Sequence, residues 1–165
     1  MLKLLVVVVG FLVTLVSAGV SHAEQSVGFA AGPTKGLGPT YRYLSDDGPW
    51  GWQVTGLPVV MPDGGFADAG ASVLYVLHRG KYGSAHLSLG AAAGVSWNIC
   101  EEGQPEFECS EDIDWLAAFG PGVGFDLHLV DNFAWSVEAS LPLFFSNGDF
   151  EGMYPIPNSS LLYYW

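Results

Sequence analysis

Eight residues of this sequence could take part in acid–base or nucleophilic chemistry. They lie among small side chains, at alternate positions of their segments. They are Arg42, Asp68, His86, Asp126, His128, Ser136, Glu138 and Ser140. A serine, a histidine and an acid on neighbouring strands are the components of a hydrolase triad. The same residues could instead form a buried polar network, in which the acids must be paired because unpaired buried charge is costly. We expect the network, with Arg42 pairing Glu138 or Asp68.

A second group of chemically capable residues is an acidic run around two cysteines. It consists of Cys100, Glu101, Glu102, Glu106, Glu108, Cys109, Glu111, Asp112 and Asp114. Carboxylate oxygens suit calcium, but the spacing does not match an EF-hand loop, which alternates its ligands around a central glycine. Solvated charge on an exposed loop also accounts for the run, and we favour that interpretation. The sequence therefore predicts no catalytic residue, no cofactor and no metal site, and it leaves open a ligand at the acidic loop.

The segments that must position these residues have the two-residue period of β-strands. In residues 84–99 the odd positions, from Ala85 to Ile99, are all apolar, whereas the even positions are small or polar. Residues 115–129 and 133–145 repeat this alternation. Successive side chains of a strand point to opposite faces, so each segment has one apolar and one small or polar face. Recurrent glycine argues against helices.

Composition separates two architectures that could use such strands. A soluble barrel would turn its apolar faces inward and leave a surface of Gly, Ala and Ser with little charge, which is poorly soluble. A membrane barrel would turn those faces to lipid and line a narrow interior with the small and polar ones. Charged residues are only 13% of the chain, and glycine occurs 22 times, which favours the membrane barrel. The chain has only five Lys and Arg residues and a net charge of −12, which argues against nucleic-acid binding.

Counting strands tests the membrane barrel, because bacterial barrels have an even number. The alternation and the turn residues predict eight, at 26–32, 37–44, 50–60, 66–78, 84–99, 115–129, 133–145 and 159–165. The two longest connections, 100–113 and 146–158, are then the fifth and the seventh. With both termini on the periplasmic side, odd-numbered connections lie outside, as long loops do in such barrels.

The amino terminus predicts export. Lys3 precedes an apolar run over residues 4–16, and Ser21 and Ala23 form a small-x-small cleavage motif. The run is shorter than the roughly 20 apolar residues of a spanning helix. We predict that residues 1–23 are a cleaved signal peptide and that residues 24–165 are the mature domain. A disulfide between Cys100 and Cys109 is the default expectation in an exported protein.

The carboxy terminus, Leu161-Leu162-Tyr163-Tyr164-Trp165, is a strand that ends on an aromatic residue, with apolar residues before it. It resembles the C-terminal assembly signal of bacterial outer-membrane barrels. With the strand count and the signal peptide, the chain resembles the small eight-stranded barrels related to the OmpA membrane domain and OmpX. This resemblance implies insertion by the barrel-assembly machinery through the strand ending in Trp165, and a filled, non-conducting interior. Members of that group include adhesins, structural tethers and lipid-modifying enzymes, so the resemblance indicates location better than activity.

The sequence thus predicts an all-β fold, an eight-stranded antiparallel up-and-down transmembrane β-barrel in the outer membrane, in contact with its lipid. The favoured function is a non-enzymatic structural or surface-interaction role through loops 100–113 and 146–158. The alternative is a lipid-modifying enzyme similar to the lipid A deacylases. A narrow pore is less favoured, because about eight strands leave room only for side chains.

Overall fold

The computed structural model describes residues 23–61, 64–98 and 113–165. They form ten strands: β1 Ala23–Ala31, β2 Gly38–Ser45, β3 Trp50–Met61, β4 Gly64–Gly80, β5 Gly83–Asn98, β6 Ile113–Val130, β7 Phe133–Ser140, β8 Leu143–Ser146, β9 Asp149–Met153 and β10 Ile156–Tyr164. Within these ranges there is no helix long and apolar enough to cross a membrane. The acidic run and both cysteines lie almost wholly outside the described residues, with only Asp114 inside them.

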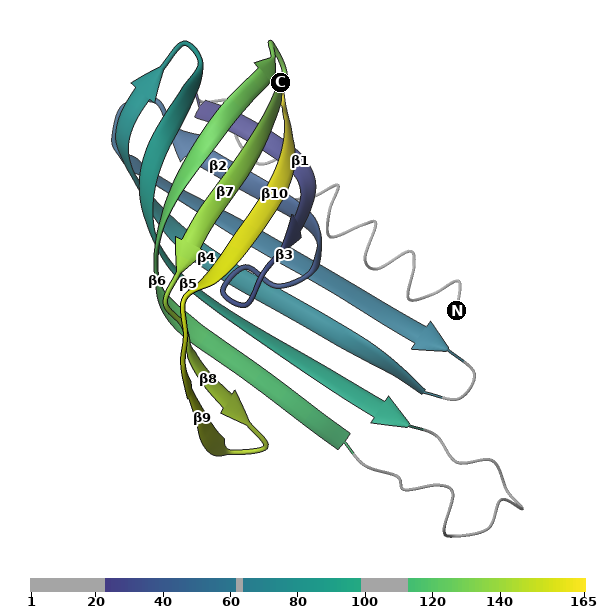
Figure 1. Cartoon of the computed structure of the whole chain (residues 1–165). Helices are drawn as coiled ribbons and strands as arrows, with labels where there is room; N and C mark the ends of the chain where they lie inside the picture. The colour runs from purple at the N-terminus through teal and green to yellow at the C-terminus, as the bar shows by residue number, and fades with distance from the viewer. Residues whose placement is uncertain (1–22, 62–63, 99–112) are drawn as a thin grey trace, which may run out of the picture.

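Eight of the strands close into an antiparallel barrel (Figure 1). Consecutive strands pair from β1 to β7, and β10 closes the ring by pairing with β7 on one side and β1 on the other. The predicted seventh strand corresponds to β7 and β8, which both pair with β6 and are separated at Leu141 and Pro142. The predicted eight-stranded antiparallel barrel is therefore confirmed.

The seventh connection differs from its prediction as a long loop over 146–158. Most of that range is strand, because β8 and β9 form a hairpin and β10 begins at Ile156. The hairpin turns at Asn147 and Gly148, whose φ angles are 49° and 97°. Asn-Gly is the favoured pair for a two-residue turn in which both residues need positive φ. The prediction of a long loop was wrong because Asn147-Gly148 forms a tight turn that lets the flanking residues pair as strands.

The two ends of the barrel have different connections. At the end we call inner, β1 starts beside the end of β2, Trp165 donates its backbone N–H to Gln25, and the β4–β5 and β6–β7 turns are tight. The opposite, outer end carries the connection at 32–37 and the β8–β9 turn. Figure 1 shows the carboxy terminus among the tight turns of the inner end. The start of β1 and the carboxy terminus therefore lie at the same end of the barrel, as predicted.

Strand length changes around the ring. The strands β4, β5 and β6 have 17, 16 and 18 residues, whereas β1, β2 and β10 have 9, 8 and 9. The long strands continue past the outer ends of the short ones. We call this continuation the extension; it comprises residues 56–61, 64–69, 92–98, 113–119, 143–146 and 149–153. The rest of the ring is the closed barrel.

Burial in the closed barrel is the reverse of that in a soluble protein. Almost every ring strand exposes large apolar side chains outward, among them Phe29, Val73, Leu89, Phe125, Trp135 and Leu161. The buried interior is mainly polar, and its hydrophobic core cluster is confined to Leu44, Leu74 and Val76. Alternation along the strands produces both faces at once, because neighbouring side chains point to opposite sides of the sheet.

Candidate functional site

The lumen of the closed barrel holds an ion pair that crosses it. The guanidinium of Arg42, on β2, lies with Nη1 2.8 Å from Oδ1 of Asp126, on β6. These strands are not neighbours in the ring, so the long arginine side chain spans the interior. Arg42 also donates to Oε1 of Gln53 at 3.0 and 2.8 Å and to Oγ of Ser136 at 3.1 Å. Because all four residues are buried, this network replaces the water that each polar group loses.

A second ion pair lies closer to the outer end, between Lys35 and Glu138. Their Nζ and Oε2 atoms are 3.4 Å apart, and both side chains are almost fully buried. Oε1 of Glu138 accepts a hydrogen bond of 3.0 Å from Nδ2 of Asn158. The prediction that Arg42 pairs with Glu138 or Asp68 was wrong, because Arg42 takes Asp126 and Lys35 supplies the second inward cation. Lys35 was missed because it lies in the connection between the predicted strands 26–32 and 37–44.

His86 connects the two ion pairs. Its Nδ1 is 3.6 Å from Oδ2 of Asp126, and its Nε2 is 3.5 Å from Oε2 of Glu138. Both distances exceed that of a good hydrogen bond, and His86 Nε2, Lys35 Nζ and Glu138 Oε2 have no hydrogen-bond partner. The centre of the lumen therefore has close charge contacts but incomplete hydrogen bonding.

Lys35 reaches the lumen because residues 32–37, which we call the plug, fold inward from the outer end. Its tight turn is closed by the N–H groups of Lys35 and Gly36, which donate to the carbonyl of Gly32 at 3.2 and 2.8 Å. Thr34 and Asn158 are joined by two hydrogen bonds, of 3.4 and 3.0 Å.

The wall opposite the plug is built of glycine because the plug backbone lies directly against it. A Cβ at Gly90 would lie 2.5 Å from the carbonyl oxygen of Thr34, and one at Gly70 would overlap that of Lys35. No side chain fits at either position without moving the plug. The plug therefore fills the lumen at this level.

The remaining predicted site residues separate in space. Ser136 and Ser140 are buried in the lumen, where Ser136 accepts from Arg42 and Ser140 accepts from Asn158 at 2.8 Å. Asp68 is half-buried beside the plug and accepts a 2.6 Å hydrogen bond from the N–H of Leu37. His128 is exposed at the inner end, where β6 runs past the lumen toward its turn. The pairing with Ala134 puts His128 on the predicted inner face, but beyond the enclosed part of the lumen, so it does not join the buried network.

These positions do not assemble a hydrolase triad. His86, the buried histidine, contacts two carboxylates, and Ser136 is held by Arg42. The described residues contain no group of three or more His, Cys, Asp or Glu side chains that could hold a metal ion. Asn158 and Gln53, which complete the network, were missed because amides carry no charge pattern and Asn158 lies one residue before the predicted last strand.

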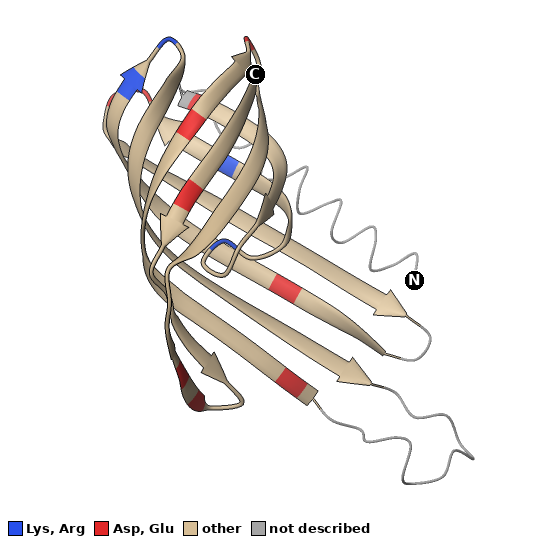
Figure 2. Cartoon of the chain, in the orientation of Figure 1, with Lys and Arg blue, Asp and Glu red and all other residues tan. Residues whose placement is uncertain are grey.

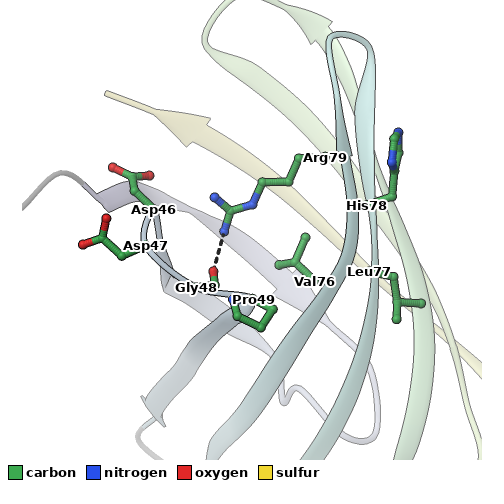
Figure 3. Close-up of a pocket in the computed structure, with 8 residues that line it drawn as sticks. All are labelled: Asp46, Asp47, Gly48, Pro49, Val76, Leu77, His78 and Arg79. Atoms are coloured by element: carbon green, nitrogen blue, oxygen red, sulfur yellow. Dashed lines mark hydrogen bonds between the residues drawn. The ribbon is translucent and has the colours of Figure 1, made fainter.

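An open pocket of about 310 Å³ lies at the inner rim, between the β2–β3 turn and the end of β4 (Figure 3). Arg79 is its main polar feature. Nη2 of Arg79 donates to the carbonyl oxygens of Ser45 at 2.6 Å and Gly48 at 3.4 Å, so it braces the turn. In Figure 3 the carboxylates of Asp46 and Asp47 point away from this guanidinium. The pocket is thus a structural contact between two turns.

A second pocket, of about 230 Å³, lies in the extension beyond the plug. Its lining combines apolar side chains with two carboxylates, and consists of Leu37, Phe66, Ala67, Asp68, Gly94, Val95, Ser96, Asp114, Trp115 and Leu116. Unlike the lumen, this pocket opens to the outside of the barrel. It is the accessible candidate site among the described residues.

No protein-family model matches this sequence, and no curated protein matches it. Solved structures similar to the chain include the outer membrane protein Ail of Yersinia pestis in a phospholipid bilayer nanodisc, with 17% identity, a TM-score of 0.44, and coverage of 87% of this chain and 98% of Ail. Ail in complex with the heparin analogue sucrose octasulfate has 16% identity and a TM-score of 0.48, covering 88% of this chain and 100% of Ail. Neisserial surface protein A has 14% identity and a TM-score of 0.38, covering 86% and 91%. The fold assignment rests on the strand pairings described above.

Proposed function

We propose that this protein is an integral outer-membrane barrel with a non-enzymatic structural or surface-interaction role. The observation that carries the proposal is the reversal of burial, with apolar side chains exposed around the wall and charged ones buried in the lumen. Soluble monomers rarely expose a contiguous apolar patch larger than about a few hundred Å². Lipid around the wall removes this apolar surface from water.

The blocked lumen supports a role outside catalysis and conduction. The plug and the two ion pairs occupy the interior, and Ser136, His86 and Glu138 are each no more than 1% exposed. A lipid-modifying site must open toward lipid, whereas these groups are enclosed by the barrel wall. The alternative, a barrel enzyme acting on lipid A, therefore finds no accessible catalytic group among the residues that the structure describes.

Interaction with partners is proposed for the outer end. Among the described residues this end includes the β8–β9 hairpin, with Asp149 and Glu151, and we propose that the acidic residues of the connection 100–113 take part as well. Ail has been crystallised with a polyanionic heparin analogue. The extension of this chain contains no Lys or Arg, and only acidic positions are coloured along it in Figure 2. We therefore propose an uncharged or cationic partner for this chain.

Delivery to the membrane is proposed to use both ends of the sequence. Residues 1–23 would be removed on export, so that the mature chain starts at Glu24. The C-terminal strand ending in Trp165 would be recognised by the barrel-assembly machinery. In the structure this strand, β10, closes the ring against β1.

Fractionation of cells that express the full chain tests the proposal. We expect the protein in the outer membrane, resistant to alkaline extraction, with an amino terminus at Glu24 and a different gel mobility before and after boiling in detergent. Protein that stays in the aqueous periplasmic fraction would overturn the proposal. Lipid A from the same cells should be unaltered; a modification that is lost in the Ser136→Ala or His128→Ala variant would favour the enzyme instead.

A further inference from the structure

The inner wall of the extension carries large apolar side chains beside a few polar ones, whereas the lumen that it continues is mainly polar. Strand register places Leu57, Val59 and Met61 of β3 on the same face as Gln53 and Thr55, which point into the lumen. On the same grounds Phe66, Leu116 and Phe144 belong to the inner wall. Met61 and Leu116 are 53% and 50% exposed, so nothing among the described residues covers them.

The outer part of β3 is apolar on both faces. Residues 56–61 read Gly-Leu-Pro-Val-Val-Met, with Val60 on the outer wall between Val59 and Met61 on the inner wall. A strand with lipid on one face and water on the other alternates apolar and polar residues, as β5 and β7 do. The loss of alternation indicates an apolar environment on both faces of β3 at this level.

The extension is also open along one side. Only residues 51–55 of β3 pair with β2, and β9 pairs only with β8, so both are edges of a curved sheet that does not close. Figure 1 shows the long strands of this sheet continuing past the ends of β1 and β10. The edges of this opening expose Val60 on β3 and Phe150 and Met153 on β9, although β9 also carries Asp149 and Glu151. We take the opening to face lipid at the level of these apolar side chains.

The free edge of β3 discourages pairing with a strand of another chain. The carbonyl of Gly56 points toward β2, because its oxygen would lie 2.8 Å from a Cβ added at Gly38. The carbonyl of Val59 points the other way, toward β4, because its oxygen would lie 2.5 Å from a Cβ added at Gly65. Backbone direction alternates along a strand, so Pro58 faces the free edge, where it offers no N–H. Proline on an edge strand is a known protection against edge-to-edge association.

The charges around the pocket indicate which polar head group a bound amphiphile would carry. Asp68 and Asp114 line the pocket, and each accepts one hydrogen bond, from the N–H of Leu37 and from Nδ2 of Asn147. A carboxylate has about four acceptor positions, so both retain capacity for a donor. No Lys or Arg lies in the extension, and the sequence places none in the connection 99–112. An anionic head is disfavoured here, and an ammonium head is favoured.

We propose that the inner wall of the extension binds the alkyl chain of a cationic amphiphile that enters sideways from the surrounding lipid. The chain lies along Leu57, Val59, Phe66 and Leu116, and its ammonium group lies near Asp68 and Asp114. A pocket of about 230 Å³ is smaller than the usual range of about 300–1,000 Å³ for drug-sized ligands, which suits a single narrow chain. This inference rests on the proposed membrane insertion.

Two methionines of the chain provide a built-in test. The Met61 side chain lies on the inner wall, whereas Met153 pairs with Leu143 on the outer side, and both are about half exposed. The full chain, labelled with ¹³C at the methionine methyl groups, is placed in phosphatidylcholine nanodiscs. Hexadecylamine carrying a nitroxide at the end of its chain is then added, in parallel with the matching nitroxide-labelled fatty acid. A Met61→Leu variant assigns the signal.

As the labelled amine is added, we expect the broadening of the Met61 signal to level off at a saturating concentration. The broadening of the Met153 signal should instead rise in proportion to the total probe in the bilayer. Binding should be about tenfold tighter for the amine than for the fatty acid, equivalent to about 1.4 kcal/mol. The Asp68→Asn, Asp114→Asn double variant should abolish that preference. Leu116→Asn should abolish saturation, and Leu129→Asn, on the same strand at the inner end, should preserve it.

Saturation that is absent in the wild type, or equal for the two probes, would overturn the inference. Because the wild-type comparison needs no variant, a variant that fails to fold does not affect it. Heat-dependent gel mobility of the same sample shows whether the barrel is inserted. An inserted barrel without saturable binding refutes only this inference, whereas a chain that does not insert refutes the proposed function as well.

Discussion

The closed barrel and the extension share the same long strands, yet the side chains that face inward differ in polarity between them. In the closed barrel the inward positions are mainly small or polar, apart from the cluster of Leu44, Leu74 and Val76, and the lumen is filled by Arg42, Lys35 and their acids. In the extension the inward positions of β3 are large and apolar, and the sheet is open along one side. The strands that stop early, β1, β2 and β10, mark the change.

This difference shows that the polarity of an inner wall depends on whether the ring of strands is closed at that level. Where the ring closes, polar groups find hydrogen-bond or charge partners across a narrow lumen. Where the ring opens toward lipid, a polar inner wall would face an apolar medium without partners. If the two regions obey these separate rules, replacing the charges of the lumen should cost the most stability, and replacing residues at the open edge should cost the least.

Replacing Arg42 should damage the closed barrel most. The Arg42→Met variant leaves Asp126 buried without its cation, and breaking a buried ion pair from one side costs about 3–5 kcal/mol. Urea unfolding in vesicles, followed by heat-dependent gel mobility, measures the free energy of unfolding. The double variant Arg42→Met, Asp126→Leu should recover much of the loss. A single variant as stable as the wild type would show that the network does not hold the barrel.

Replacing Lys35 should cost less and should act through the plug. Glu138 keeps its hydrogen bond from Asn158 in the Lys35→Met variant, so we expect a loss of about 2–3 kcal/mol for the unpaired charge. The same unfolding measurement applies, with planar-bilayer conductance added to detect an opened lumen. The control is Lys81→Met at the exposed β4–β5 turn, which should change neither quantity. An equal effect of both variants would contradict the role of the plug.

Adding one methyl group beneath the plug should have a moderate effect. In the Gly70→Ala variant the new Cβ overlaps the Lys35 carbonyl, so the plug must shift, at a cost of about 1–2 kcal/mol. Gly56→Ala is the matched control on β3, because its Cβ would lie 3.5 Å from its nearest neighbour, the carbonyl of Asp68. Similar unfolding energies for the two alanine variants would show that the plug does not rest on Gly70.

Replacing Pro58 should hardly change stability but should change association. Surface changes of this kind alter the free energy of unfolding by about 0.5 kcal/mol or less. Pro58→Ala restores a backbone N–H at the open edge of β3, so we expect more cross-linked dimer than in the wild type at equal protein-to-lipid ratio. Pro39→Ala, on the paired strand β2, is the control. No increase in dimer would show that the edge is protected by something other than Pro58.

Alternation along the strands predicted much of the fold and part of the network. It identified eight strands, placed Arg42, His86, Asp126, Ser136, Glu138 and Ser140 on the inner face, and assigned the apolar positions to the outer wall. It did not show that His128 lies outside the network, because parity gives the face of a strand but not where the lumen ends. It failed for Lys35, because residues 32–37 have no period that would show a turn folding inward.

The sequence by itself determined which face of each strand is apolar, since side-chain alternation is a local property of extended backbone. Only the tertiary structure decided which acid meets which cation, because β2 and β6 face each other across the lumen without being neighbours in the ring. Only the tertiary structure, too, separated the closed barrel from the extension, since that boundary depends on where neighbouring strands stop. Contacts across a closed ring join residues far apart in sequence, and no local pattern records them.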